Sequence, residues 1–364
     1  MKNIVLPPLL RSKRELFDEV YPQKLPISTS GITYNMAQTA EWLDQDYFAV
    51  GRWDGSLSIF SYSDSLDNGP LISTAVSSPS TEGIQSIISL NDSMFVTSYI
   101  NNSMIIWSKG GKYWKELNNF RILSYNCDFG AVNSGKTYNL DNKTFLIIGH
   151  SNGFLTIWES IKNKYDFKIA KTMDLRSSKP TNPWELNNIR AIQINHTEDG
   201  KIFILTGSEN GDINLIDFPN GNILATKVYN SDAQRGINSV SLLDDLLLVA
   251  NCSVGKSDKN LWLFKIDYYK AKIDFLDSIN LRVDNSDPQV FNFCVRWGFY
   301  KSGLCFFSST EEGIFWMGRV KDKQKIEIIG YQTITSQLGA AIAFNKQGNL
   351  VVVAYNLYEY DTMK

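Results

Sequence analysis

Few side chains in this sequence are suited to proton transfer or metal binding. The 364 residues include two histidines, His150 and His196, which do not stand at the spacing of a metal site. Histidine is the side chain that titrates near neutral pH without perturbation, so its scarcity argues against general acid–base chemistry. The cysteines lack the close pairs of zinc and redox motifs: Cys127, Cys252, Cys294 and Cys305. We therefore expect buried free thiols, no metal ion and no cofactor.

Three glutamates are the best candidates for catalysis. Two carboxylates at a suitable separation divide the roles of acid and base in a hydrolase. Glu209, Glu311 and Glu312 have the required chemistry, but turn acids are commonly just solvated. The sequence contains no Gly-rich phosphate loop, nucleophile elbow or metal-binding His-Glu motif. It therefore favours a non-catalytic protein and leaves a hydrolase or lyase with dispersed carboxylates as the alternative.

The overall charge does not favour nucleic acid or a membrane surface as a partner. The chain has 36 basic and 38 acidic residues, a formal net charge of −2. Four segments nevertheless interleave lysine with aromatic residues, as a stacking surface for nucleic acid would: KGGKYWK from Lys109, KNKYDFK from Lys162, KIDYYKAK from Lys265 and RVKDKQK from Arg319. Lysine also protects exposed sheet edges from unwanted pairing. A nucleic-acid-associated adaptor is thus the second alternative.

Membrane insertion and secretion are not indicated either. No segment approaches the roughly 20 apolar residues of a membrane helix. The apolar run in residues 1–10 is short and is broken by Pro7 and Pro8, unlike a secretory signal. We expect a soluble intracellular protein, located in the cytoplasm.

The elements that must position these residues follow one hairpin pattern. FAVGRWDGSLSIF, from Phe48, has two β-rich runs around an Asp-Gly turn. The pattern recurs about every 50 residues, at FVTSYINNSMIIW from Phe95, FLIIGHSNGFLTIW from Phe145, FILTGSENGDINLID from Phe203, LLVANCSVGKSDKNLWLF from Leu247, LCFFSSTEEGIFWMG from Leu304 and LVVVAYNLYEYD from Leu350.

Another short alternating run precedes most hairpins: GIQSIISL from Gly83, NIRAIQINH from Asn188, GINSVSLL from Gly236, NFCVRWGF from Asn292 and GAAIAFN from Gly339. We expect this run to be the inner strand a, the hairpin to be strands b and c, and the segment that follows, such as KYDFKIAKTM from Lys164, to be the outer strand d. Gly83, Gly236 and Gly339 would allow close backbone approach. The sequence therefore predicts an all-β fold, a single seven-bladed β-propeller of four-stranded antiparallel blades.

The type and spacing of these segments resemble the WD-repeat family over about residues 30–361. The family's Trp-Asp dipeptide is echoed at the ends of c strands, by Trp107-Ser108, Trp158-Glu159, Ile216-Asp217 and Tyr360-Asp361. Its upstream Gly-His dipeptide is missing, so the family's Asp-His-Ser/Thr-Trp hydrogen-bond relay is not expected in any blade. The resemblance implies a WD-repeat-like propeller that serves as an interaction scaffold.

The last hairpin ends near Asp361, which leaves its blade without an outer strand. Because an open edge invites pairing, we expect KLPIST from Lys24 to close the ring, just before a first inner strand at residues 31–37. The predicted organisation is an N-terminal arm, residues 1–23, and a propeller, residues 24–364. In the arm, SKRELFDEVY from Ser12 predicts about two helical turns, which would either dock a partner or plug the rim.

In a propeller the b–c and d–a loops lie on one face, and in the family that the sequence resembles this face commonly binds partners. Two long d–a inserts, beginning at Asp174 and Leu281, would lie on it. Asparagines in the b–c turns are expected to supply left-handed backbone: Asn101, Asn102, Asn152 and Asn210.

Trp53 differs from these asparagines, because a turn has no need of tryptophan, so it is a candidate for partner contact or for packing on the next blade. Mixed charges with aromatic residues suit a protein partner, without membrane or cofactor. The predicted partner-binding residues are Arg52, Trp53, Asp54, Tyr99, His150, Trp184, Glu209, Lys256, Glu311 and Tyr355. Function is therefore predicted to be that of a scaffold or a subunit of a larger complex.

Overall fold

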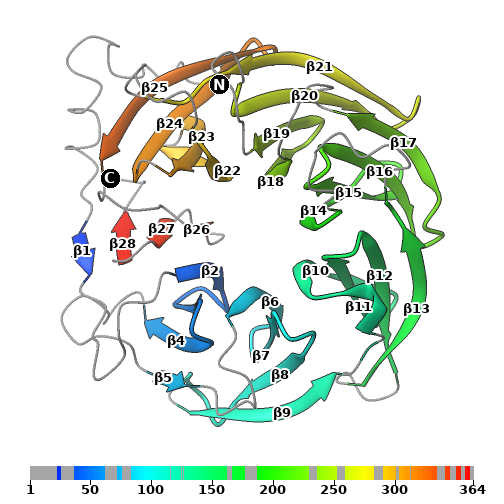
Figure 1. Cartoon of the computed structure of the whole chain (residues 1–364), viewed down its shortest axis with the longest axis vertical. Coiled ribbons are helices and arrows are strands. Elements are labelled where there is room, and N and C mark those ends of the chain that lie inside the picture. Colours follow the sequence, from blue (N-terminus) through cyan, green and yellow to red (C-terminus); the bar gives the residue numbers. More distant parts are fainter. Residues whose placement is uncertain are drawn as a thin grey trace.

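Four-stranded antiparallel sheets stand around a central axis, with their inner strands toward it and their outer strands at the rim (Figure 1). This computed structural model describes residues 23–25, 37–61, 72–75, 83–114, 116–123, 125, 127–161, 166–176, 187–228, 236–251, 259–282, 290–300, 303–311, 313–333, 341–344, 350–353 and 357–360. The expected N-terminal arm and most of the two long inserts lie outside these residues.

Six sheets each consist of four strands that are consecutive in the described chain, in the order a, b, c, d. The first three are β2 (Ala37–Trp42), β3 (Tyr47–Arg52), β4 (Ser56–Ser61), β5 (Ile72–Ala75); β6 (Ile84–Asn91), β7 (Met94–Tyr99), β8 (Met104–Lys109), β9 (Leu117–Leu123); and β10 (Val132–Leu140), β11 (Lys143–His150), β12 (Phe154–Ser160), β13 (Phe167–Asp174). The next three are β14 (Ile189–His196), β15 (Ile202–Ser208), β16 (Asp212–Phe218), β17 (Ile223–Val228); β18 (Ile237–Leu243), β19 (Leu246–Asn251), β20 (Leu261–Asp267), β21 (Lys272–Ile279); and β22 (Asn292–Tyr300), β23 (Gly303–Thr310), β24 (Ile314–Lys321), β25 (Lys325–Thr333).

A further four-stranded sheet joins the two ends of the chain. It contains β26 (Ala341–Phe344), β27 (Leu350–Val353), β28 (Leu357–Tyr360) and, at its outer edge, β1 (Gln23–Leu25). With it, the described strands make seven sheets, six of them built from consecutive strands. The prediction of an all-β propeller with four-stranded antiparallel blades is confirmed, as are the assigned hairpins.

The strand that closes the ring lies where the sequence predicted it. β1 pairs antiparallel with β28, Lys24 opposite Tyr358. The first inner strand was predicted wrongly at residues 31–37, because it is β2, which begins at Ala37. Its register is fixed by pairing of Ala37 with Arg52 and by a turn in which Asp44 accepts hydrogen bonds from the backbone N–H groups of Asp46 and Tyr47, both at 3.0 Å.

The core lies between neighbouring sheets. The b strands of the first six sheets are buried on both faces over most of their length, so they contain apolar runs instead of an alternating pattern: every residue of β15 is buried. Between the sheets that begin with β6 and β10, Val96 and Ile106 pack in one cluster with Ile148 and Trp158. At the rim, by contrast, β17 is largely exposed. The described residues include one short 3-10 helix, η1 (Cys127–Phe129), and no helix among them is long and apolar enough to cross a membrane.

Side-chain hydrogen bonds join adjacent inner strands. Ser134 on β10 donates to the Ile189 carbonyl on β14 at 2.7 Å, and Gln193 on β14 donates to the Val240 carbonyl on β18 at 3.0 Å. Farther along, the Trp297 N–H on β22 donates to Ser241 Oγ on β18 at 2.9 Å. Such bonds satisfy polar groups near the axis and fix the height of one blade relative to the next.

The b–c turns share one geometry in five blades. In each, an N–H donates to the carbonyl three residues earlier, as from Gly55 to Arg52 at 3.1 Å, and the donor residue is left-handed. The left-handed residues are Gly55, Asn102, Gly153, Gly211 and Gly313. The expectation was therefore right for Asn102 and wrong for Asn101, Asn152 and Asn210. Those three residues use their side chains as hydrogen-bonding groups instead, as Asn101 Oδ1 does with the Ser103 N–H at 3.2 Å.

Two glycines stand directly before inner strands, where the b–c turn of the preceding blade lies against them and leaves no room for a side chain. A Cβ on Gly236 would be 1.8 Å from the Glu209 carbonyl oxygen, and one on Gly83 would be 2.9 Å from that of Trp53. The prediction of close backbone approach is confirmed for both, whereas Gly339 lies outside the described residues. The neighbour is the adjacent turn, so these glycines seat one blade on the next.

Candidate functional site

Three of the predicted partner-binding residues are buried and unavailable to a partner. Arg52, Tyr99 and His150 each occupy the last position of a b strand and are 4%, 0% and 0% exposed. Each pairs with the first residue of its inner strand, which places the side chain inside the propeller. The prediction for them was wrong because their position next to a turn suggested exposure, whereas the strand continues through them.

His150 belongs to a hydrogen-bond chain within its blade. The Trp158 indole N–H donates to Thr156 Oγ1 at 2.9 Å, and the Thr156 hydroxyl lies 2.8 Å from His150 Nε2. His150 Nδ1 lies 3.3 Å from the Gly130 carbonyl, which can only accept, so Nδ1 carries the proton and Nε2 accepts from Thr156. Burial lowers the pKa of His150 to about 4. The histidine is therefore a neutral structural residue.

In other blades, different residues form the hydrogen bonds at the position that His150 occupies in its blade. Trp107 donates to Thr97 Oγ1 at 2.8 Å, and Thr97 in turn lies 3.2 Å from the Tyr99 hydroxyl. Arg52 donates to Ser58 Oγ at 2.8 Å. The blade of His150 thus contains a His-Thr-Trp chain. Its histidine belongs to the dipeptide Gly149-His150 at the end of strand b instead of upstream of the inner strand, and its second ring nitrogen faces a backbone carbonyl instead of an aspartate, so the family's full relay is not reproduced.

The predicted acidic residues support their own turns. Glu209 pairs with Arg190 at 3.0 Å and accepts from Asn188, and Glu311 Oε1 accepts from the Phe291 N–H at 2.8 Å. Asp54 similarly accepts from the Ser56 N–H at 2.9 Å. The two glutamates hold b–c turns against the start of inner strands and Asp54 stabilises its own turn, a structural use that the hydrolase alternative did not anticipate.

Trp53 remains a surface residue. Its side chain is 44% exposed, while its backbone lies against Gly83 of the next blade. The turn therefore packs on the neighbouring blade, and contact of the exposed indole with a partner stays a prediction. The remaining predicted residues of this face lie outside the described residues: Trp184, Lys256, Glu312 and Tyr355.

The side chains that the structure brings together lie at the mouth of the central channel. In six blades the pairing of strands a and b slips between the first and third residue of the inner strand, a β-bulge at the same place. The second residue is therefore left out of the ladder. These residues all line a central cavity of about 390 Å³: Gln38, Gln85, Asn133, Arg190, Asn238 and Phe293.

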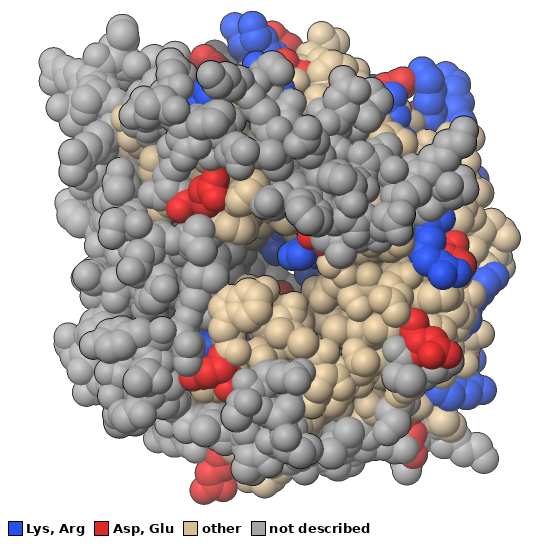
Figure 2. Space-filling view, viewed as in Figure 1, with Lys and Arg blue, Asp and Glu red and all other residues tan. Residues whose placement is uncertain are grey.

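We call these six residues the bulge ring. Four of them are carboxamides, which both donate and accept hydrogen bonds, and Trp53 lines the same cavity. Deeper residues of the cavity wall include Glu41, Lys136 and Arg296. The molecule is hollowed at its centre, where Lys and Arg atoms are visible inside the opening (Figure 2). The channel mouth is thus polar, with an exposed indole at its edge.

Sequence reasoning missed the bulge ring although a signal for it exists. Most inner strands begin with an apolar residue, a polar residue and a small residue, as in IQS from Ile84, VNS from Val132, IRA from Ile189 and INS from Ile237. The polar residue of each triplet is the bulged one. Alignment of the inner strands, instead of the b–c turns alone, would have singled it out.

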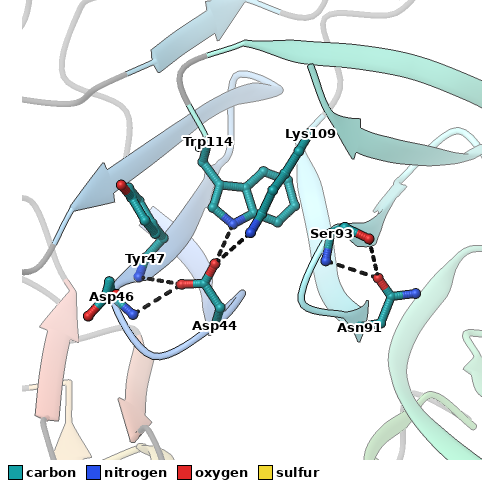
Figure 3. A network of polar contacts seen from close by, with 7 residues as sticks. All are labelled: Asp44, Asp46, Tyr47, Asn91, Ser93, Lys109 and Trp114. Carbon is teal, nitrogen blue, oxygen red and sulfur yellow. Dashed lines mark hydrogen bonds and ion pairs between the residues drawn. The ribbon is translucent and has the colours of Figure 1, made fainter. Parts of the chain in front are cut away.

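The lysine-rich segments lie at c–d turns, as predicted, and several of their cations form ion pairs. Lys109 lies 2.9 Å from Asp44, which also accepts from the buried Trp114 indole at 2.8 Å, so that the two blades are joined (Figure 3). Arg319 pairs with Glu327 at 2.6 Å. Charges neutralised in this way contribute less to a field that would attract nucleic acid.

Cysteine and metal chemistry has little support in the part of the chain that is described. Cys294 and Cys305 are buried and free, as expected, and burial raises the pKa of Cys305 to about 12. The side chains of Cys127 and Cys252 are outside the described set. Within that set, no group of three His, Cys, Asp or Glu residues is arranged to hold a metal ion.

The closed ring, the four-stranded blades and the channel define a β-propeller. Among solved structures the chain is similar to the β-propeller domain of Cps50 (Swd1) from Myceliophteria thermophila, with a TM-score of 0.63 and 14% identity over 93% of this chain and 99% of that one. No family model and no curated protein matches the sequence. The likeness supports the fold that the repeats predicted.

Proposed function

We propose that this chain is a non-catalytic interaction scaffold, a subunit of a larger complex, that binds a protein partner on the face formed by the b–c and d–a loops. The observation that carries the proposal is the position of Trp53, 44% exposed beside a cavity lined by the bulge ring. Tryptophan is enriched among residues that dominate binding energy. Since the Trp53 backbone is seated against Gly83, the turn that carries the indole is fixed before a partner arrives, which lowers the entropy lost on binding.

The chemistry of the mouth also suits a polypeptide. Carboxamides on four blades offer donors and acceptors that match a peptide backbone. The similar propeller domain in the solved structure is named for Cps50 (Swd1), and its likeness at 14% identity supports the architecture only. The assignment to a scaffold therefore rests on the surface of this chain.

The test is affinity capture from native extract with the full chain as bait. Trp53→Ala is the variant, and Tyr269→Ala is the matched control, since Tyr269 is 72% exposed at the c–d turn between β20 and β21, on the opposite face. We expect Trp53→Ala to weaken capture by about 30-fold, the effect of losing roughly 2 kcal/mol at an anchor residue, and Tyr269→Ala to retain it. Equal capture by both variants, each with unchanged melting temperature, would contradict the proposed face.

A further inference from the structure

Two cations face the channel from opposite walls without a carboxylate partner among the described residues. Lys136 on β10 and Arg296 on β22 both line the cavity, and each stands four residues after the first residue of its inner strand. Two sheets separate their blades on one side of the ring and three on the other. The two residues therefore stand at the same position of facing inner strands.

Neither of these two cations is held by a carboxylate of the described residues. Arg296 Nη1 donates to Ser239 Oγ and to the Val295 carbonyl, both at 2.8 Å, so neutral groups hold the guanidinium in place. Lys136 forms no ion pair with a described residue. By contrast, Arg190 in the bulge ring is already paired with Glu209.

The charge of the described channel wall is therefore positive. Arg190 is neutralised by its ion pair with Glu209. The remaining charged residues of the wall are two cations, Lys136 and Arg296, and one carboxylate, Glu41, which stands on a third blade and makes no ion pair with either cation. A cation in a narrow cavity has lost part of its hydration, so a carboxylate that enters can replace the missing water. In the described wall, two cations lack a carboxylate partner. Two isolated positive charges match a few carboxylates of a bound segment better than the continuous row of phosphates of a nucleic acid.

The bulge ring lies above these cations and adds groups that a peptide backbone can use. Gln38, Gln85 and Asn133 line the mouth with carboxamides, and the Gln85 Nε2 group, which is buried without a hydrogen-bond partner, would gain one if its side chain turned toward a bound backbone. A polypeptide that inserts acidic side chains toward Lys136 and Arg296 would place its backbone at the level of these amides.

We propose that the channel binds an acidic segment of the partner polypeptide, with its carboxylates paired to Lys136 and Arg296 and its backbone against the bulge ring. This proposal rests on the proposed function and names the chemistry of the partner. It implies that binding weakens as salt is raised, because the pairs at the mouth are partly screened.

The experiment compares a fluorescein-labelled, end-capped hexapeptide of glutamate with the isosteric hexapeptide of glutamine, by fluorescence anisotropy with the full chain at low salt. We expect at least about a tenfold preference for glutamate, which corresponds to roughly 1.4 kcal/mol. The double variant Lys136→Gln/Arg296→Gln should abolish the preference. If the double variant folds poorly, the single variant Lys136→Gln is used instead, and it should reduce the preference. Lys168→Gln, on the exposed rim strand β13, is the charge-matched control and should keep it.

Equal affinity for the two peptides, or a preference that survives the double variant, would overturn the proposal. So would a labelled oligothymidylate that binds more tightly than the glutamate peptide and depends on the same two cations. The proposed function is separable from this result: loss of partner capture by Trp53→Ala without any glutamate preference leaves the face standing and rejects the acidic segment alone.

Discussion

Protonation of His150 should destabilise the propeller in mildly acidic solution. The side chain is fully buried, and its pKa falls from 6.5 to about 4 because burial disfavours the imidazolium. A depressed histidine pKa means that the unfolded chain binds the proton more readily, so the stability is present above pH 6.5 and is lost as the pH falls toward 4. With about 1.36 kcal/mol for each pKa unit, the loss is roughly 2 kcal/mol between pH 7 and pH 5 and roughly 3 kcal/mol by pH 4.

Urea unfolding at pH 7 and pH 5 measures this loss, with His150→Gln as the variant that cannot titrate but keeps a donor for Gly130 and an acceptor for Thr156. The wild type should lose about 2 kcal/mol more than the variant between the two pH values. His196→Gln is the control, because it removes the exposed second histidine and should behave like the wild type. The reasoning is refuted if His150→Gln and the wild type lose stability equally. NMR titration of the wild type supplies an independent check, since one of the two imidazoles should titrate near pH 4.

Two further variants test the packing of the blades. Asp44→Ala should lower the free energy of unfolding by about 2–4 kcal/mol in urea titrations, because it leaves the buried Trp114 indole without its acceptor. Asp267→Ala removes the acceptor of two exposed turn amides and an exposed ion pair with Lys270, so it should cost about 1 kcal/mol or less. Equal losses of unfolding free energy in the two variants would show that the hydrogen bond from Trp114 to Asp44 adds no more stability than an exposed turn. Asp212→Asn should stabilise the chain by about 1–3 kcal/mol at pH 8 and by about half as much at pH 5, since burial raises the pKa of Asp212 from 3.8 to about 6 and the wild type loses stability as the pH rises from the lower value through the higher one. A gain that is the same at both pH values would contradict this account.

The hairpins could be predicted from sequence because both strands and the turn leave a local signature. Apolar b strands such as β15 are recognisable as runs of consecutive large residues, and the turn residue Gly211 marks the reversal. The closing strand β1 followed from the unfilled edge of β28. The first inner strand was misplaced because β2, AQTAEW, is short and mixes polar with apolar residues, and its register depends on pairing with β3.

The site could not be predicted to the same extent, because burial at a strand end depends on the neighbouring blade. Nothing local distinguishes the buried His150 from the exposed Trp53, although both stand at b–c turns. The imidazole is enclosed by its own blade and by Gly130, whereas the indole lies one residue beyond the last strand position. Acidic residues were similarly misjudged, because Glu209 is held by Arg190, which comes from another strand.

These two kinds of position show where a propeller can vary its binding chemistry. The last residue of strand b differs among blades, Arg52, Tyr99, His150, Ser208, Asn251 and Thr310, yet all six are buried. Their variety reflects different ways to satisfy one internal hydrogen-bonding position, so it has no direct meaning for a partner. The bulge ring also varies, from carboxamide to arginine and phenylalanine, but its residues are released from the ladder and line the channel. A change there alters the surface without breaking a sheet hydrogen bond, and for this reason we place recognition at the bulge ring and Trp53 instead of at the ends of the b strands.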